Sequence, residues 1–333
     1  MAKKVLVVLA AGLATRFGSL KQLQGVNDFN EVLLDYSVYD AKRAGFTAVV
    51  FIIKREMEKE FEARIARHLR PYIEVRYAYQ DMTDLPVDVK LDPERTKPLG
   101  TAHALYCTRK SVKADEKMVV INADDYYGIQ AYQTLADYLD QTDMQVNGQA
   151  EYAMVAFEIS KTLSEEGTVS RGVCAISEAG YLSDIHERTQ IAYITKEQAG
   201  CDANSCSLEA MLAMENGERL IGYTEDDGET WTLLAPHTPV SMNIWAFDYS
   251  IFTLCENYVK EFLINSLAKN PLKGECYLPM AIGEARELGN VVVKAFKGSD
   301  QWFGLTYKSD QPKVQAAIKE LIADKVYPPQ LWA

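Results

Sequence analysis

Residues 4–22 read KVLVVLAAGLATRFGSLKQ, an apolar run that passes directly into a glycine-containing loop. A short run that is apolar on both faces is typical of a parallel strand buried between layers of helices. The loop after such a strand lies at the carboxyl edge of the sheet, where ligands bind in open α/β folds. Gly12 and Gly18 let backbone amides approach a ligand closely. Arg16 and Lys21 supply positive charge suited to phosphate groups.

Two common phosphate-binding motifs are missing from this loop. Its spacing matches neither the G-x-x-x-x-G-K-[ST] of a P-loop nor the G-x-G-x-x-G of dinucleotide-binding proteins. The second absence argues against a nicotinamide-dependent oxidoreductase. On the residues alone, a phosphate-binding loop and a plain βα turn with two solvated basic side chains are about equally good interpretations.

Strand-like and helix-like segments alternate through the first half of the chain. Apolar and β-branched runs predict strands, and apolar residues at helical spacing predict helices. The strands are expected at 4–10, 48–53, 73–79, 117–123 and 151–159, and the helices at 31–44, 55–69, 101–110 and 130–139. Repeated βα units of this kind predict the α/β class, with a mostly parallel, doubly wound sheet.

The second half of the chain has a different pattern. Residues 172–176 and 181–185 flank a Glu-Ala-Gly turn and predict a hairpin, so we expect a β-rich subregion added to the sheet. Residues from about 190 to 230 are polar and rich in turn formers, which indicates an excursion from the core. Further elements are expected as strands at 239–247 and 290–296 and as helices at 250–268 and 312–325.

Composition limits the partners that this chain is expected to have. The formal net charge is -12, and such a field repels nucleic acids and anionic membranes. No stretch of the sequence is long and apolar enough to span a bilayer. The six cysteines are scattered without paired spacing, which favours reduced thiols. We therefore expect a cytoplasmic protein with no nucleic-acid or membrane partner, and its oligomeric state stays open.

Two adjacent carboxylates, Asp124 and Asp125, follow the strand predicted at 117–123. Magnesium prefers hard oxygen ligands, commonly one or two carboxylates together with substrate phosphates. At the carboxyl edge of the sheet, these side chains would lie beside the loop that follows the first strand. A pair of aspartates that caps the next helix is the alternative interpretation, and we favour the metal site.

The loop at residues 9–22 resembles the signature loop of the sugar-phosphate nucleotidyltransferase superfamily, in which an L-A-A-G-x-x-x-R stretch is followed shortly by Lys. The matching residues are Leu9, Ala10, Ala11, Gly12, Thr15, Arg16 and Lys21. The loop departs from the family at Leu20, where many members have Pro. The resemblance implies the nucleotide-diphospho-sugar transferase fold and nucleotide contacts by residues 9–12. It also implies catalytic roles for Arg16 and Lys21.

Other stretches extend the resemblance to the metal and the base. Asp124 falls on the metal-binding aspartate of the family, which implies Mg²⁺ as the cofactor. Gln80, Gly100 and Thr101 fall where the family holds the nucleotide base. A Gln amide can pair with a pyrimidine edge through both its donor and its acceptor. Without the resemblance, a solvated Gln and a Thr that caps a helix are the simpler interpretations.

The acceptor side is also implied by the resemblance. Gly172 and Glu187 match a pattern in which a Gly-Val strand precedes Glu-Lys-Pro, whose Glu binds sugar hydroxyls and whose Lys binds the sugar phosphate. Arg188 stands in place of this Lys and Thr189 in place of the Pro. Arg188 is therefore predicted to hold the acceptor phosphate, with a different reach. Asn243 matches a polar contact on the strand that closes the sugar pocket.

One feature of the family is missing. Many members carry a second metal-binding Asp late in the chain after a Trp, and residues 302–306, WFGLT, contain none. Asp300 and Asp310 are the candidates to replace it.

The resemblance implies a single nucleotidyltransferase domain over residues 1–333. Its nucleotide-binding half would extend to about residue 150, and its acceptor-binding half from about 151 to 333. The implied reaction joins a nucleoside triphosphate, with UTP or dTTP favoured, to a sugar 1-phosphate and releases pyrophosphate. Two alternatives stay open. One is a cytidylyltransferase that acts on phosphocholine or a similar phosphorylated alcohol, held by an aromatic cage. The other is a non-catalytic homologue that senses nucleotides.

Overall fold

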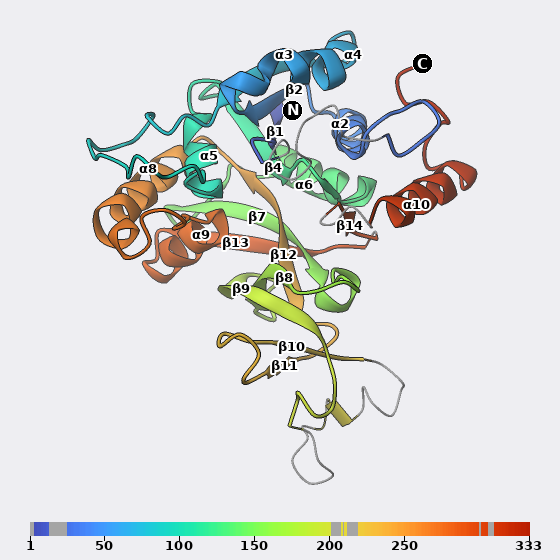
Figure 1. Ribbon diagram of the computed structural model, residues 1–333. Helices are drawn as coiled ribbons and strands as arrows, with labels where there is room; N and C mark the ends of the chain where they lie inside the picture. Colours follow the sequence, from blue (N-terminus) through green and yellow to red (C-terminus); the bar gives the residue numbers. More distant parts are fainter. Residues whose placement is uncertain are drawn as a thin grey trace.

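The structure is a computed structural model that describes residues 3–12, 25–200, 208, 210–211, 219–299, 301–305 and 310–333. Within these residues, twelve strands form one sheet in the order β11-β10-β9-β8-β12-β4-β1-β2-β3, with β7 joined to β12, and with β6 and β13 joined to β7. In Figure 1 the helices lie around the upper part of this sheet, and β8 to β11 extend downward from it.

The first part of the sheet is parallel. Four strands pair in parallel in the order β4-β1-β2-β3, and their bounds are β1 (Lys3–Leu9), β2 (Ala48–Ile53), β3 (Glu74–Tyr79) and β4 (Glu116–Asn122). Every residue of β2 is buried. A parallel strand is covered on both faces, so its apolar run is nearly continuous, as the sequence predicts.

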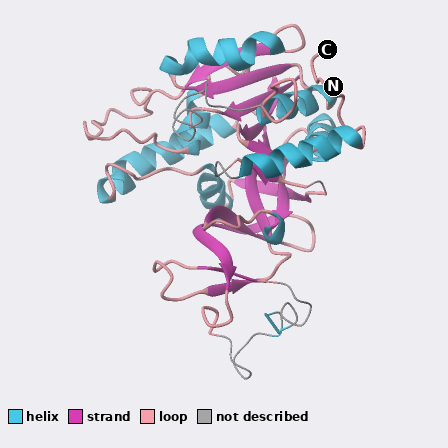
Figure 2. Ribbon diagram, turned by 45° about the vertical axis from the view of Figure 1, so that its right-hand side comes forward, coloured by secondary structure: helices cyan, strands magenta, loops and turns pink. Residues whose placement is uncertain are grey.

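Helices connect these strands and cover the sheet on both sides (Figure 2). The helices of this half are α2 (Leu33–Arg43), α5 (Thr101–Cys107), α6 (Ile129–Gln141) and a continuous helical stretch made of η2 (Arg55–Met57), α3 (Glu58–Phe61), η3 (Glu62–Ala66) and α4 (Arg67–Leu69). Each strand of the parallel part therefore ends at the same edge of the sheet, where its following loop leads into a helix.

The second part of the sheet is mainly antiparallel. Its strands are β6 (Gln145–Val146), β7 (Gln149–Glu158), β8 (Val169–Ile176), β9 (Leu182–Ile194), β10 (Leu220–Tyr223), β11 (Thr232–Leu234), β12 (Pro239–Phe247) and β13 (Val291–Lys297). β12 pairs antiparallel with β4 and thereby joins the two parts, and its register with β7 shifts between Ser241 and Trp245. β13 runs parallel to β7.

The remaining elements complete the described part of the chain. They are the strands β5 (Asp125–Tyr126) and β14 (Phe303–Gly304), which pair with each other, the helices α8 (Ile251–Glu261), α9 (Leu278–Glu287) and α10 (Gln311–Ala323), and the short helical segments η4 (Ile159–Lys161), η5 (Phe262–Ser266) and η6 (Leu267–Lys269), of which η5 and η6 continue directly from α8.

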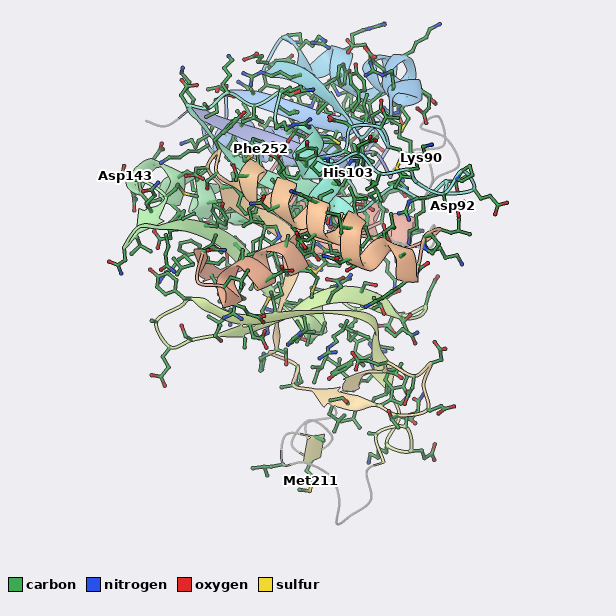
Figure 3. The ribbon with its side chains drawn as sticks, turned by 90° about the vertical axis from the view of Figure 1, so that its left-hand side faces the viewer. Lys90, Asp92, His103, Asp143, Met211 and Phe252 are labelled. Carbon is green, nitrogen blue, oxygen red and sulfur yellow. The ribbon has the colours of Figure 1, made fainter. Side chains whose placement is uncertain are left out.

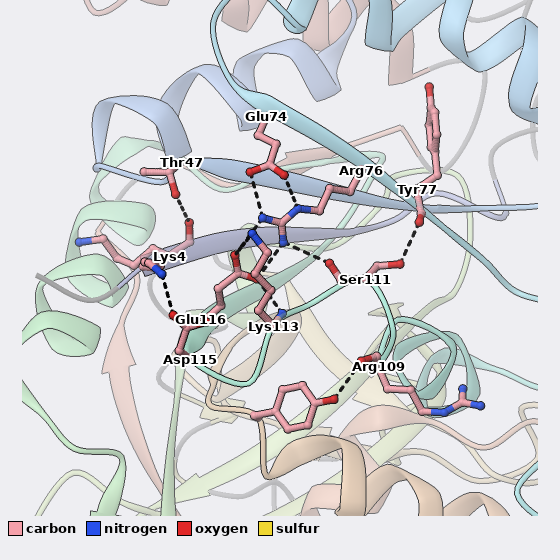
Figure 4. A network of polar contacts seen from close by, with 12 residues as sticks. Lys4, Thr47, Glu74, Arg76, Tyr77, Arg109, Ser111, Lys113, Asp115 and Glu116 are labelled. Atoms are coloured by element: carbon pink, nitrogen blue, oxygen red, sulfur yellow. Dashed lines mark hydrogen bonds and ion pairs between the residues drawn. The ribbon is translucent and has the colours of Figure 1, made fainter.

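A polar network ties the amino ends of the parallel strands together (Figure 4). Arg76 of β3 donates to both carboxylate oxygens of Glu116 at 2.8 and 2.9 Å, and it also pairs with Glu74. The Thr47 hydroxyl before β2 donates to the carbonyl oxygen of Lys4 in β1. This edge of the sheet is closed by ion pairs and holds none of the predicted site residues, so the opposite, carboxyl edge is the place to look for chemistry.

The predicted α/β fold and its added β-rich region are confirmed, with two differences of detail. β9 does not end near residue 185 but continues to Ile194, because β10 pairs with its far end. Helix α9 is absent from the predicted elements, although Pro279 lies in its first turn, a common position for Pro at a helix start. No helix in the described part of the chain is long and apolar enough to cross a membrane.

Candidate active site

A cavity of about 690 Å³ lies where the carboxyl ends of β1 and β4 meet β8, β9 and β12. The predicted site residues in its wall are Leu9, Ala11, Gly12, Gln80, Gly100, Thr101, Asp124, Gly172, Glu187 and Asn243. Another cavity, of about 700 Å³, follows the loop at residues 82–95 and contains none of them. We therefore take the cavity that contains the predicted residues as the candidate site.

The segment after β1 forms one end of the cavity. Ala11 and Gly12 line it, whereas Ala10 is fully buried and its N–H donates to the carbonyl oxygen of Ile52 at 2.9 Å. This bond extends the pairing of β1 with β2 by one residue and so fixes where the loop begins. Arg16 and Lys21, the two predicted catalytic cations, lie outside the described residues.

The loop between β3 and α5 forms the next section of the wall. Gln80 follows β3, and its Nε2 donates to the carbonyl oxygen of Gly100 at 3.0 Å. Gly100 has φ +101°, and a Cβ there would lie 2.5 Å from the carbonyl oxygen of Cys276, so only glycine fits. The Thr101 hydroxyl accepts the N–H of Leu278 at 2.8 Å, and so it helps to hold the beginning of α9.

Asp124, the predicted metal ligand, follows β4 and lines the cavity. Its carbonyl oxygen accepts the N–H of Leu305 at 3.0 Å, which brings the segment after β14 beside it. Asp125 also lines the cavity, and its Oδ2 accepts Asn122 Nδ2 at 2.8 Å and the Tyr127 hydroxyl at 3.2 Å. The potential metal ligands at the end of β4 are carboxylate oxygen atoms, which Mg²⁺ prefers.

The second metal carboxylate has no counterpart in the described wall of the cavity. Asp310 stands at the beginning of α10 and is not among the lining residues, and Asp300 lies outside the described residues. A Cβ on Gly304 would lie 2.6 Å from Asp125 Oδ1, so a side chain at Gly304 would displace that carboxylate. In the described part of the chain, no group of three or more His, Cys, Asp or Glu residues is arranged to hold a metal ion.

Gly172 and Glu187 face the cavity from two neighbouring strands. They stand opposite each other in the ladder of β8 and β9. Burial raises the pKa of Glu187 from its ordinary value of 4.5 to about 7, and the nearby guanidinium of Arg171 opposes this shift. The carboxyl therefore changes its charge near neutral pH, at the place predicted for contacts to acceptor hydroxyls.

Arg188 does not line the cavity, contrary to its predicted role. Its guanidinium forms an ion pair with Glu225 and lies 4.5 Å from the centre of the Tyr223 ring. Successive residues of a strand point to opposite faces. Because β9 continues through this position, Glu187 and Arg188 are separated by the sheet. The sequence motif places them side by side, but the strand directs only one of them into the cavity.

Two cations that lacked an assigned role line the cavity. Arg171 stands next to an irregularity in the β8 ladder, and its guanidinium lies 5.0 Å from the centre of the Trp302 ring, which also lines the cavity. Lys97 pairs with Glu275 at 2.5 Å, and the Tyr277 hydroxyl donates to the same carboxylate at 3.0 Å. The signal in the sequence is slight: Lys97 stands three residues before the Gly100 turn, and Arg171 stands directly before the Gly-Val pair that begins at Gly172.

Asn243 lies in the cavity wall but is held by the protein itself. Its Nδ2 donates to Asn122 Oδ1 at 2.8 Å, and its Oδ1 accepts the indole N–H of Trp245 at 3.2 Å. Its backbone has φ +63°, a conformation that costs energy for a residue other than Gly, at the point where the β12 register shifts. Through Asn122 it is connected to Asp125, so it positions the end of β4.

Comparisons with known proteins bear on the family and the fold. The family model for nucleotidyl transferases matches residues 5–161. Curated proteins give no match. A solved structure from Bacillus anthracis, described as a glucose-1-phosphate thymidylyltransferase in complex with sucrose, is 14% identical, with a TM-score of 0.57 over 95% of this chain and 96% of that one. A UDP-glucose pyrophosphorylase complexed with UDP-glucose is 14% identical, with a TM-score of 0.55 over 96% of this chain and 99% of that one. The predicted fold is confirmed, and the family predicted from residues 9–22 is the one whose model matches residues 5–161.

Proposed function

We propose that this chain, whose residues 5–161 match the nucleotidyl transferase family model, joins a nucleoside triphosphate to a sugar 1-phosphate and releases pyrophosphate. UTP or dTTP is the favoured nucleotide. The observation that carries the proposal is the shared cavity: residues that follow β1, β3 and β4 face residues of β8 and β9 across one space. Its volume of about 690 Å³ lies within the roughly 300–1,000 Å³ usual for small-molecule sites.

The proposed reaction is an in-line displacement at the α-phosphorus of the nucleotide. An oxygen of the acceptor phosphate forms the new bond, and the bond from the α-phosphorus to the bridging oxygen of the pyrophosphate breaks. A phosphate is already ionised near neutral pH, so the attack needs no general base. The protein must therefore position the two substrates and neutralise charge. Arg16 and Lys21 are the cations proposed to stabilise the leaving pyrophosphate.

The oxygen donors at the end of β4 fit a magnesium ion. Asp124 is the proposed ligand, with Asp125 beside it in the cavity wall. Bound there with the triphosphate, Mg²⁺ would neutralise charge on the phosphate oxygens. Asn122 and Tyr127 hold the Asp125 carboxylate in place, and this limits how far the end of the strand can move.

Arg171 is the residue proposed to hold the acceptor phosphate, in place of Arg188. It lines the cavity, whereas Arg188 is engaged with Glu225 away from the cavity. A guanidinium binds phosphate oxygens through paired N–H donors. Both terminal nitrogens of Arg171 donate to the backbone carbonyl oxygens of Ser170 and Thr162, so the acceptor phosphate would share or replace these bonds. Glu187 lies close enough for its pKa to respond to the Arg171 charge, so the phosphate and the sugar hydroxyls of one acceptor would be held together.

The described wall gives little support to the phosphocholine alternative. An aromatic cage surrounds a quaternary ammonium with several rings. The aromatic residues among the described lining residues are Tyr277 and Trp302, and the Arg171 guanidinium already lies over the Trp302 ring. A second cation at that ring would be repelled.

The test is pyrophosphate release in the presence of Mg²⁺, measured across a matrix of nucleoside triphosphates and phosphorylated acceptors. We expect release with UTP or dTTP and a sugar 1-phosphate, and loss of release when EDTA removes the metal. Release with CTP and phosphocholine would replace the proposed acceptor. A protein that binds nucleotide but releases no pyrophosphate with any pair would contradict the proposal.

A further inference from the structure

The side-chain amide of Gln80 is held in one orientation by its neighbours. Its Nε2 lies 3.0 Å from the carbonyl oxygen of Gly100 and 3.5 Å from Nδ1 of His103. A carbonyl oxygen only accepts hydrogen bonds, so the NH₂ end of the amide must point toward Gly100. Gln80 is also part of the cavity wall. Its Oε1, an acceptor, is therefore the atom that remains for a ligand.

His103 is in the tautomer that supports this orientation. It lies on α5, packed beneath α8 and fully buried (Figure 3). Its Nε2 is 3.0 Å from the carbonyl oxygen of Asp84, so Nε2 carries the hydrogen. Burial lowers the pKa of His103, so the ring is neutral at pH 7. A neutral ring with its hydrogen on Nε2 has a lone pair on Nδ1, which accepts from Gln80.

The carbonyl that fixes this tautomer is itself anchored. Arg109 donates to both carboxylate oxygens of Asp84, at 2.9 and 2.5 Å. Other titratable groups lie near His103. They are Asp81, Tyr106, whose ring centre is 6.4 Å from that of His103, Cys276, which bonds to the His103 backbone, and the thiol of Cys107, whose Sγ is 3.6 Å from Nε2. Burial raises the pKa of that thiol to about 12, so it is uncharged. Hydrogen bonds therefore connect Arg109 through Asp84 and His103 to Gln80 in the cavity wall.

We propose that His103 is a positioning residue that sets base specificity by holding Gln80 with its carbonyl oxygen toward the cavity. This inference rests on the proposed use of the cavity for a nucleotide. Uracil and thymine carry an N–H at ring position 3, which can donate to Gln80 Oε1. Cytosine carries a lone pair at that position, which would face the oxygen. A pyrimidine held in one pose is therefore accepted as UTP or dTTP and disfavoured as CTP.

The wild-type protein should bind UTP more tightly than CTP, with a ratio of dissociation constants of about 10 or more, the usual size of one unmatched polar contact. Isothermal titration with Mg²⁺ measures this ratio without requiring turnover. Tighter binding of CTP than of UTP overturns the proposal. Failure to release pyrophosphate while the UTP preference is present contradicts the proposed function and leaves the base selection intact.

Two substitutions separate the contacts of His103. His103→Asn keeps an acceptor near the Nδ1 position and removes the donor to Asp84. His103→Gln keeps a donor near the Nε2 position and removes the acceptor next to Gln80. We expect the UTP preference to fall by about fivefold or more in His103→Gln and to stay within about twofold in His103→Asn. An unchanged ratio in His103→Gln, or an equal fall in both variants, shows that His103 is only structural.

A measurement on the wild type covers the case in which the variants do not fold. The chain has four histidines, so the ring nitrogens can be resolved by ¹⁵N NMR. We expect the resonances of His103 to show a neutral ring with its hydrogen on Nε2 at pH 7 and above, and to titrate at a lower pH than the ordinary histidine value of about 6.5. A hydrogen on Nδ1, or a charged ring at pH 7, would remove the acceptor that His103 offers to Gln80 and overturn the proposal.

Discussion

The two walls of the cavity present their residues in different ways. On the nucleotide side, Gly12, Gln80 and Asp124 each follow the carboxyl end of a parallel strand. On the acceptor side, Gly172 and Glu187 lie within strands and reach the cavity from the face of an antiparallel ladder.

This difference decides how far each wall tolerates a change of register. Loops after parallel strands converge on one edge whatever the exact residue at which each strand ends. Within a strand, a shift of one residue moves a side chain to the opposite face. The nucleotide wall is therefore defined by topology, and the acceptor wall by residue alternation.

The largest expected effect is on the nucleotide wall, at Asp124. Asp124→Asn keeps the size of the side chain and removes its charge. We expect kcat/KM to fall by at least about 100-fold, because metal-assisted charge stabilisation is usually worth several kcal/mol. Steady-state pyrophosphate release measures this.

Asp143→Asn is the matched control, since Asp143 is exposed at the edge of the molecule (Figure 3) and does not line the cavity. It should keep wild-type activity. Equal activity of the two variants would remove Asp124 from the metal site and with it the assignment of the nucleotide wall.

The next effect compares the two arginines that stand opposite each other in the β8 and β9 ladder. Arg171→Ala should raise the KM for the acceptor and lower kcat/KM by about 10–100-fold, the size expected for a lost hydrogen bond to a charged group. Arg188→Ala should change kcat/KM by less than about threefold, since its partner is Glu225. The reverse order of effects would restore the role that the sequence motif predicts for Arg188.

This pair of arginines also shows what the sequence could and could not predict. The run before Ala10 and the carboxylate at Asp124 are sufficient to place residues at the edge of a parallel sheet. The roles of Glu187 and Arg188 depend on whether the chain at this point is a strand or a loop. β9 remains a strand there because β10 pairs with its far end, and these two strands are separated by a long polar stretch. No local sequence pattern indicates that β9 and β10 pair.

The third effect concerns stability and pH at Glu187. Its pKa is raised from 4.5 to about 7 by burial, so between these values the folded protein holds a proton that the unfolded chain has released. Stability is therefore lost as the pH rises through this window, by about 1–3 kcal/mol in total. Glu187→Gln, which cannot ionise, should raise the Tm at pH 8 by about 2–6 °C and leave it unchanged near pH 5.

Differential scanning fluorimetry from pH 5 to 9 measures this difference. Glu178→Gln, in the exposed turn between β8 and β9, is the control and should shift the Tm at no pH. A Glu187→Gln variant that is less stable than the wild type at pH 8 would show that the carboxylate is well solvated or paired, contrary to the structure.

The smallest effect distinguishes two glycines that pack against the same side chain. A Cβ on Gly172 would lie 3.2 Å from Ile185 Cδ1, and a Cβ on Gly283 would lie 3.0 Å from Ile185 Cγ2. Each change to Ala should lower stability by about 1 kcal/mol through crowding. Gly172 alone of the two lines the cavity, so only Gly172→Ala should raise the KM for the acceptor, by a few-fold. If Gly172→Ala and Gly283→Ala have the same KM for the acceptor, β8 does not form part of the acceptor site.

The most direct test of the two-wall account is a crystal structure of the protein with Mg²⁺ and a bound nucleotide sugar such as UDP-glucose. The account predicts the base against Gln80 and Gly100, the diphosphate beside Asp124, and a sugar hydroxyl within hydrogen-bonding distance of Glu187. A sugar bound on the opposite face of β9, beside Arg188 and Tyr223, would contradict it.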